Sequence, residues 1–420
     1  MKKGLVWILG LIMLRPHPEI LGSQLAVYLG DLLLLGFLLF IVARKKSLVL
    51  VPASRTGLLI GAVFLVVDWW LALFNLHLGG IQPDVVRFTL LGLFLVLLLD
   101  YFHTEVEDSR WRSVLDGFFW VMLGIVLLQL LNPPVLGDLV RMIWGSVKLR
   151  DIWHGYPRVY GAFYNANWFG IYLVFMLSVW VSELKDSRDF RMRDMARFGA
   201  LMVMFFLSGS RTALVGAGIV VMLAVWPLGI FLVRMVRKTR FLVALAVLFV
   251  LLGWGSQYLE IFGKLVDRYL SFQAVLLDGQ ADNSMVGRIS LWREGFTWYE
   301  MRPALGYGTL PGDYLPHNSY LSVALAMGWP GLVGLLVFVG WFFFQALIRY
   351  LRFGHSPSLG FCLFTAALAV MSLSGEYFFA GQVMLLWLLA LVWALGPACP
   401  GIRYSQEISE PGGLVGEVSV

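Results

Sequence analysis

Apolar runs of about 20 residues, each long enough to span the hydrocarbon core of a bilayer as a helix, recur along almost the whole chain. Only helices and closed barrels satisfy their backbone hydrogen bonds inside lipid. The runs are continuous rather than alternating in polarity, and this pattern favours helices over barrel strands. We therefore predict an all-α, polytopic integral membrane protein.

The composition agrees with a membrane protein. The 420 residues are 59% hydrophobic and only 14% charged, whereas a soluble domain carries about 25% charged residues. In a soluble protein the net charge of +6 would suggest nucleic acid as a partner. Here most of the excess lies in short loops between apolar runs, where it sets topology, so no nucleic acid partner is expected.

The positions of the apolar runs predict about twelve transmembrane helices. The charge of the connections alternates, and the Arg- and Lys-rich set should be cytoplasmic, as should both termini. The basic N-terminus followed by an apolar run resembles a signal peptide without a cleavage site, so we interpret it as an uncleaved first anchor. The predicted spans are about 4–14 (extending toward 22), 24–43, 57–76, 84–102, 114–131, 166–184, 195–208, 212–233, 241–257, 318–348, 359–378 and 380–396.

One connection on the outer side is unusually long. It covers about 258–317, and long ordered loops are usually functional. We predict four parts: helices 1–9 in 1–257, a large periplasmic loop in 258–317, helices 10–12 in 318–396, and a disordered cytoplasmic tail in 397–420.

The long loop contains an amphipathic stretch from Val286 to Tyr299. Ile289, Trp292, Phe296 and Tyr299 fall on one helical face, so this helix should lie along the outer membrane surface. An ordinary outer loop that rests on lipid is the alternative.

Three arginines are candidates for binding phosphate. Arg211 follows a tight Ser-Gly-Ser turn between two apolar runs, where its guanidinium can hold phosphate oxygens bidentately. Arg288 and Arg293 lie in the amphipathic stretch, and Arg288 shares a face with Trp292, four residues away. The alternatives are that Arg211 snorkels or caps a helix, and that the other two attract anionic lipids in general.

His317 is the candidate for proton transfer. It follows Pro316 at the start of the tenth span, and a histidine at a membrane interface can take a proton near neutral pH. Asn318 could orient the ring or cap the helix. The alternative is a histidine that only caps the helix at the interface.

Three acids, Asp31, Asp68 and Glu376, lie inside or near apolar runs, where ionisable groups are unfavourable and suggest function. Glu376 is on the same side as the arginines, and each acid has a buried structural role as its alternative. The chain has no P-loop, Rossmann fingerprint, HExxH or GxSxG motif, and its two cysteines form no cluster. Neither a metal nor a cofactor is therefore expected.

The polar motifs together resemble the O-antigen ligase and polymerase superfamily of bacterial membrane glycosyltransferases. The resemblance covers about residues 20–395, and its order and topological side both agree. The segments that carry it are 163–170, 208–214, Gly287-Arg288 leading into Trp292, 303–308, 317–321 and 328–331.

This resemblance implies transfer of a glycan from undecaprenyl diphosphate at the periplasmic face of the bacterial inner membrane. The acceptor would be a sugar of the lipid A core or another glycan, and the mechanism metal-independent and inverting. Arg211 and Arg288 match the family's diphosphate-holding arginines, Arg293 matches less securely, and His317 matches the proposed base. Asn165, Asn167, Asn318 and Glu376 are possible substrate contacts.

Other functions remain open at this point. The compact length and the number of spans resemble ligases more than polymerases, although both share the short motifs. A flippase of lipid-linked sugars would use Asp31 and Asp68 as coupling groups, but transporters usually show repeated halves, which this sequence lacks. A non-catalytic membrane scaffold is the third class.

Overall fold

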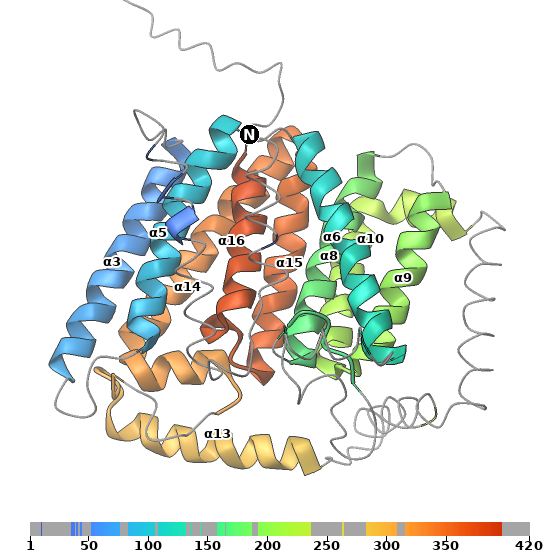
Figure 1. Ribbon diagram of the computed structural model, residues 1–420. Coiled ribbons are helices and arrows are strands. Elements are labelled where there is room, and N and C mark those ends of the chain that lie inside the picture. Colours follow the sequence, from blue (N-terminus) through green and yellow to red (C-terminus); the bar gives the residue numbers. More distant parts are fainter. Residues whose placement is uncertain are drawn as a thin grey trace, which may run out of the picture.

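The computed structural model describes residues 52–75, 83–105, 108–131, 158–163, 165–186, 192–236, 283–308 and 316–396, with a few isolated positions elsewhere. Within these ranges every regular element is a helix and there is no strand (Figure 1). The all-α prediction is confirmed for this part of the chain. The helices are α3 (Pro52–Phe74), α5 (Pro83–Glu105), α6 (Asp108–Leu131), α8 (Ala166–Asp186), α9 (Met192–Ser208), α10 (Arg211–Val236), α13 (Asn283–Met301), α14 (Ser319–Phe353), α15 (Ser356–Met371) and α16 (Gly381–Leu395), with short 3-10 turns η4 (Ser372–Ser374) and η5 (Tyr377–Phe379).

Predicted spans overlap the helices α3, α5, α6, α8, α9, α10, α14, α15 and α16. The span predicted at 359–378 is too long at its end, because α15 stops at Met371 and the 3-10 turns η4 and η5 follow. Five helical segments in the described ranges are long and apolar enough to cross a membrane: Arg55–Leu73, Trp111–Leu130, Ala166–Leu184, Ser319–Phe353 and Ser356–Ser374. The predicted spans at 4–14, 24–43 and 241–257 lie almost wholly outside the described residues, as do the first part of the long loop and the tail 397–420.

The helices α14, α15 and α16 lie in the middle of the bundle, with α3 and α5 on one side and α6, α8, α9 and α10 on the other (Figure 1). Glycines let α8, α10 and α15 approach closely. A Cβ on Gly170 would lie 2.5 Å from the Cβ of Ala213, and one on Gly216 would lie 2.4 Å from the Met371 sulfur. In lipid no hydrophobic effect drives helices together, so the close packing that small residues permit stabilises such crossings.

The long helix α14 is kinked near its start. Gly328 has a φ of 64° and a ψ of −170°, a conformation essentially restricted to glycine, and Pro330 lacks an N–H, so the carbonyls of Leu325 and Ala326 lose their helical partners. The segment 302–308, which follows α13, replaces them. Tyr307 N donates to Leu325 O at 2.8 Å and Gly308 N donates to Ala326 O at 2.7 Å.

The backbone of α14 also donates a hydrogen bond to the segment that follows α13. Trp329 N, released from Leu325 O, donates to Pro303 O at 2.8 Å. A Cβ on Gly328 would lie 2.5 Å from Ala304 O, so only glycine permits this contact between backbones. The two sequence segments 303–308 and 328–331 therefore interlock, and they fix α13 to α14.

The helix α13 lies across one end of the bundle instead of along it (Figure 1). Of the predicted apolar face, Ile289, Trp292 and Tyr299 are half-buried. Phe296 differs from them, because its side chain is 56% exposed. The placement of α13 along a membrane surface stays a prediction.

Candidate functional site

The polar motifs gather at the end of the bundle that α13 crosses. The helices α10 and α14 begin there and α15 ends there, as the contacts between Thr212, Ser319 and the α15–α16 connection show. That connection, residues 372–380, contacts the elements that carry Arg211 and His317. It was singled out from the sequence only at Glu376, although a polar Ser-Gly-Glu-Tyr segment between two apolar runs was a signal that could have marked it.

His317 and Glu376 form a pair. His317 Nδ1 lies 3.1 Å from Glu376 Oε2, and the side chains are 48% and 17% exposed. An ionised carboxylate only accepts hydrogen bonds, so beside one the tautomer of a neutral imidazole that fits this contact has its hydrogen on Nδ1 and its lone pair on Nε2. His317 also has a φ of 50°, a left-handed conformation that strains a residue with a Cβ and is found at functional sites.

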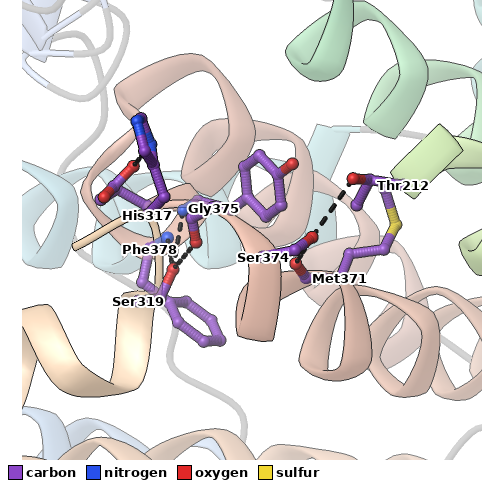
Figure 2. Close-up of polar contacts among 9 residues, drawn as sticks. Thr212, His317, Ser319, Met371, Ser374, Gly375 and Phe378 are labelled. Carbon is purple, nitrogen blue, oxygen red and sulfur yellow. Dashed lines mark hydrogen bonds and ion pairs between the residues drawn. The ribbon is translucent and has the colours of Figure 1, made fainter. Parts of the chain in front are cut away.

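Ser319 holds the two members of this pair in place (Figure 2). Its hydroxyl donates to Gly375 O at 2.7 Å and accepts from Tyr377 N at 2.7 Å. Its own N–H also donates to Gly375 O, at 3.1 Å. Because Glu376 lies between the two residues that Ser319 binds, its backbone is fixed relative to His317.

Asn318 is a helix cap. Its side-chain oxygen accepts from Tyr320 N at 3.0 Å and from Leu321 N at 3.1 Å, which satisfies donors in the first turn of α14. Of the roles considered from the sequence, capping is therefore the one the geometry shows.

Arg211 is half-buried at the first position of α10, next to Thr212. Thr212 Oγ1 lies 3.2 Å from Ser374 Oγ, so the start of α10 meets the connection that carries Glu376 (Figure 2). The hydroxyl of Ser374 also donates to Met371 O, at 3.0 Å, which fixes it on the last turn of α15.

Tyr377 lies where these elements meet, with its side chain 2% exposed. Burial raises the pKa of its phenol. The neighbouring Thr212 hydroxyl and the charge of Arg288 oppose this shift in pKa without cancelling it. Arg288, which projects from α13, is thus close enough to act electrostatically on the α15–α16 connection.

Two asparagines considered as substrate contacts hold the neighbouring turns together. Asn165 Oδ1 accepts from Asn167 N and Trp168 N, both at 2.9 Å, and so caps α8. Asn167 Oδ1 accepts from Ser210 Oγ at 2.9 Å and from Arg158 Nη2 at 3.1 Å.

Arg158 also donates through Nε to Ser208 O, at 3.1 Å. It was not singled out from the sequence, where its only signal was a position a few residues before the asparagines.

The remaining candidates are not brought into this cluster. Arg293 is exposed and follows Arg288 by five residues, which turns it to a different side of α13. Asp68 is buried within α3, a helix that packs against α14 and α5, and Asp31 lies outside the described residues. The described ranges hold no group of three or more His, Cys, Asp or Glu side chains that could bind a metal.

Together, these apolar helices and the polar cluster at one end define a membrane-embedded protein. Residues 197–336, 140 of the 420 residues, match the family described as O-antigen ligase. This match confirms the resemblance to the O-antigen ligase superfamily, and it indicates a glycosyltransferase of the ligase or polymerase type. The matched segment contains Arg211, Arg288, Arg293 and His317 but ends before Glu376. No curated protein matches the chain.

Proposed function

We propose that this protein moves an O-antigen-type glycan from undecaprenyl diphosphate to a sugar of the lipid A core at the periplasmic face of the inner membrane. The observation that carries the proposal concerns the α15–α16 connection. His317 pairs with Glu376 of this connection, the segment of Arg211 contacts it through Thr212, and the charge of Arg288 acts on its Tyr377. A proton acceptor and guanidinium groups at one place suit a reaction that deprotonates a hydroxyl and expels a phosphate.

The mechanism follows from these groups. The acceptor hydroxyl attacks the anomeric carbon of the donor sugar while His317 Nε2 takes its proton. The bond between that carbon and the diphosphate oxygen breaks, and the lipid diphosphate leaves with the electron pair. Attack opposite the leaving group inverts the configuration, and no metal takes part. Glu376 stabilises the imidazolium that forms, as the carboxylate does in other acid–base pairs of this kind.

The guanidiniums of Arg211 and Arg288 neutralise the charge that develops on the leaving diphosphate. Fixed donors of this kind act in a partly dry site without reorganising during the reaction. Arg293 is the least supported of the three arginines because it faces away from the cluster, and Asn167 would act through its contact with Arg158.

The proposed periplasmic position is supported by the charge at the opposite end of the bundle. Arg193 and Arg197 lie near the start of α9 and pair with Asp116 of α6, while the polar cluster lies beyond the end of α9. Basic residues mark cytoplasmic connections, so the cluster would face the other side.

A strain that lacks this gene tests the proposal. If the protein is a ligase, full-length glycan accumulates on undecaprenyl diphosphate and none reaches the lipid A core. Single repeats on the core would instead indicate a polymerase, the other activity of the superfamily. Unpolymerised donor that stays on the cytoplasmic side would indicate a flippase and refute the proposal. Full-length glycan on the core, as in the parent strain, would refute it as well.

A further inference from the structure

Arg158 lies where three helix ends meet, at the same end of the bundle as Arg211. Its Nε donates to the carbonyl of Ser208, the last residue of α9, at 3.1 Å. Its Nη2 donates to the side-chain oxygen of Asn167, the second residue of α8, at 3.1 Å. The same oxygen accepts from the hydroxyl of Ser210, which directly precedes α10, at 2.9 Å. One guanidinium and one amide oxygen thus join the end of α9 to the starts of α8 and α10.

The turn held by this guanidinium leads directly into Arg211. Ser208 and Ser210 are fully buried, and Gly209 between them has a φ of 58°, which lets the chain reverse between α9 and α10. The hydroxyl of Ser210 also accepts from the backbone N–H of Ala213 at 3.3 Å and so caps α10. Because α10 begins immediately after the turn, the backbone position of Arg211 depends on how firmly the turn is held.

An arginine suits this place for two reasons. The carboxyl end of a helix carries a partial negative charge, so a cation beside the last carbonyl of α9 is stabilised by that helix. The planar guanidinium also presents its N–H groups in fixed directions, so one side chain can hold two acceptors on different helices at once. Lysine would keep the charge but could not reproduce this bridge. Substitution therefore separates the effect of the charge from the effect of the bridge.

We infer that Arg158 is a positioning residue, which acts through Asn167 and the turn 208–210 to hold Arg211 in place for the lipid diphosphate. This inference rests on the proposed function and deepens it, because it adds a residue that would not touch the donor itself. Its Nε and Nη2 are engaged by acceptors of the protein. A clamp whose backbone is already fixed loses less conformational freedom when the donor binds, so it binds more tightly.

Direct binding of a polyprenyl diphosphate tests the inference. Geranylgeranyl diphosphate is titrated into the purified full-length protein in lipid–detergent micelles, and geranylgeraniol measures the contribution of the tail. Arg158→Ala should weaken diphosphate binding by about tenfold, because Arg211 is no longer held, and geranylgeraniol binding should stay unchanged. Arg158→Lys should weaken diphosphate binding to a similar extent, since the bridge is lost although the charge remains.

The same titration in variant backgrounds shows whether the two arginines act as a unit. If Arg158 acts only through Arg211, adding Arg158→Ala to Arg211→Ala causes no further loss of affinity. In a His317→Ala background the full effect of Arg158→Ala should persist, because the histidine takes no part in holding the turn. A loss of stability alone would not produce this selective coupling.

Gln129→Met is the matched control. Gln129 lies on α6 and holds the same chain segment as Arg158, but not the turn before α10. Its Nε2 donates to Gly161 O at 2.7 Å, and its Oε1 accepts from Gly161 N at 2.9 Å and from Tyr160 N at 3.2 Å. This variant should lower the melting temperature and keep the affinity for the diphosphate.

The outcomes separate the inference from the function beneath it. Wild-type affinity in Arg158→Ala or in Arg158→Lys overturns the inference alone, as does a further loss when Arg158→Ala is added to Arg211→Ala. An equal loss of affinity in Gln129→Met also overturns it, because the effect would then be one of stability. A wild-type protein that binds the diphosphate no more tightly than geranylgeraniol overturns the proposed function as well. If Arg158→Ala fails to fold, Arg158→Lys in the same backgrounds decides the question.

Discussion

Replacing Glu376 by Gln tests the pairing with His317 most directly. The variant keeps the size of the side chain and can still accept a hydrogen bond from Nδ1, but it removes the negative charge. During transfer His317 becomes positive, so the loss should affect the rate of the chemical step rather than the binding of the donor.

The magnitude follows from the geometry of the pair. Two unit charges roughly 4 Å apart interact with about 4 kcal/mol at the effective dielectric near a protein surface. His317 is 48% exposed, and solvent screens such a pair substantially. Hydrogen bonds to charged groups contribute about 1.5–3 kcal/mol, so we expect the transfer rate to fall by about 10- to 100-fold.

The assay is single-turnover transfer by the protein in liposomes, with the enzyme sites in excess over the lipid-linked glycan donor and with a core acceptor present. Glu294→Gln is the matched control, because Glu294 is an exposed carboxylate on α13. An unchanged rate in Glu376→Gln, or weaker donor binding with an unchanged rate, would refute the assignment of Glu376 to the histidine.

Three further outcomes are expected. His317→Ala should lower transfer by about 10²–10⁴-fold and leave donor binding intact, and loss of binding alone would contradict its role as a base. Arg211→Ala and Arg288→Ala should each weaken donor binding by about 10- to 100-fold, with a smaller effect for Arg293→Ala; unchanged turnover in both variants would exclude the diphosphate clamp. Gly328→Ala should destabilise the protein by about 1–3 kcal/mol, since the φ of this residue is positive and a Cβ would meet Ala304 O. Equal denaturation midpoints of the variant and the wild type in detergent would contradict the interlock.

The helices were predictable because the length and continuity of apolar runs determine them almost alone. The predicted span at 166–184 and the helix α8 begin at the same residue, since Asn165 supplies a cap just where the apolar run starts. The seventh predicted span, 195–208, ends with α9 for a related reason, because the Ser-Gly-Ser turn follows it.

The contacts between motifs were not predictable from one sequence. Thr212 and Ser374 are 162 residues apart, and nothing in their local sequence indicates that they meet. Polar residues beside the spans were predicted to be possible substrate contacts, among them Asn165, Asn167 and Asn318. Their side-chain oxygens instead accept hydrogen bonds from backbone and side-chain donors of the protein. Polarity alone does not distinguish a group that binds substrate from one that caps a helix.

The interlock between α13 and the kink of α14 has a consequence for how the site is prepared. Arg288 lies on α13, and His317 lies two residues before Ser319, where the short part of α14 before the kink begins. Hydrogen bonds from 303–308 join these two helices, so the relative position of the backbone segments that carry the two side chains is set before any lipid binds. The donor would bind to a preorganised site, so its binding energy would not be needed to order the two segments.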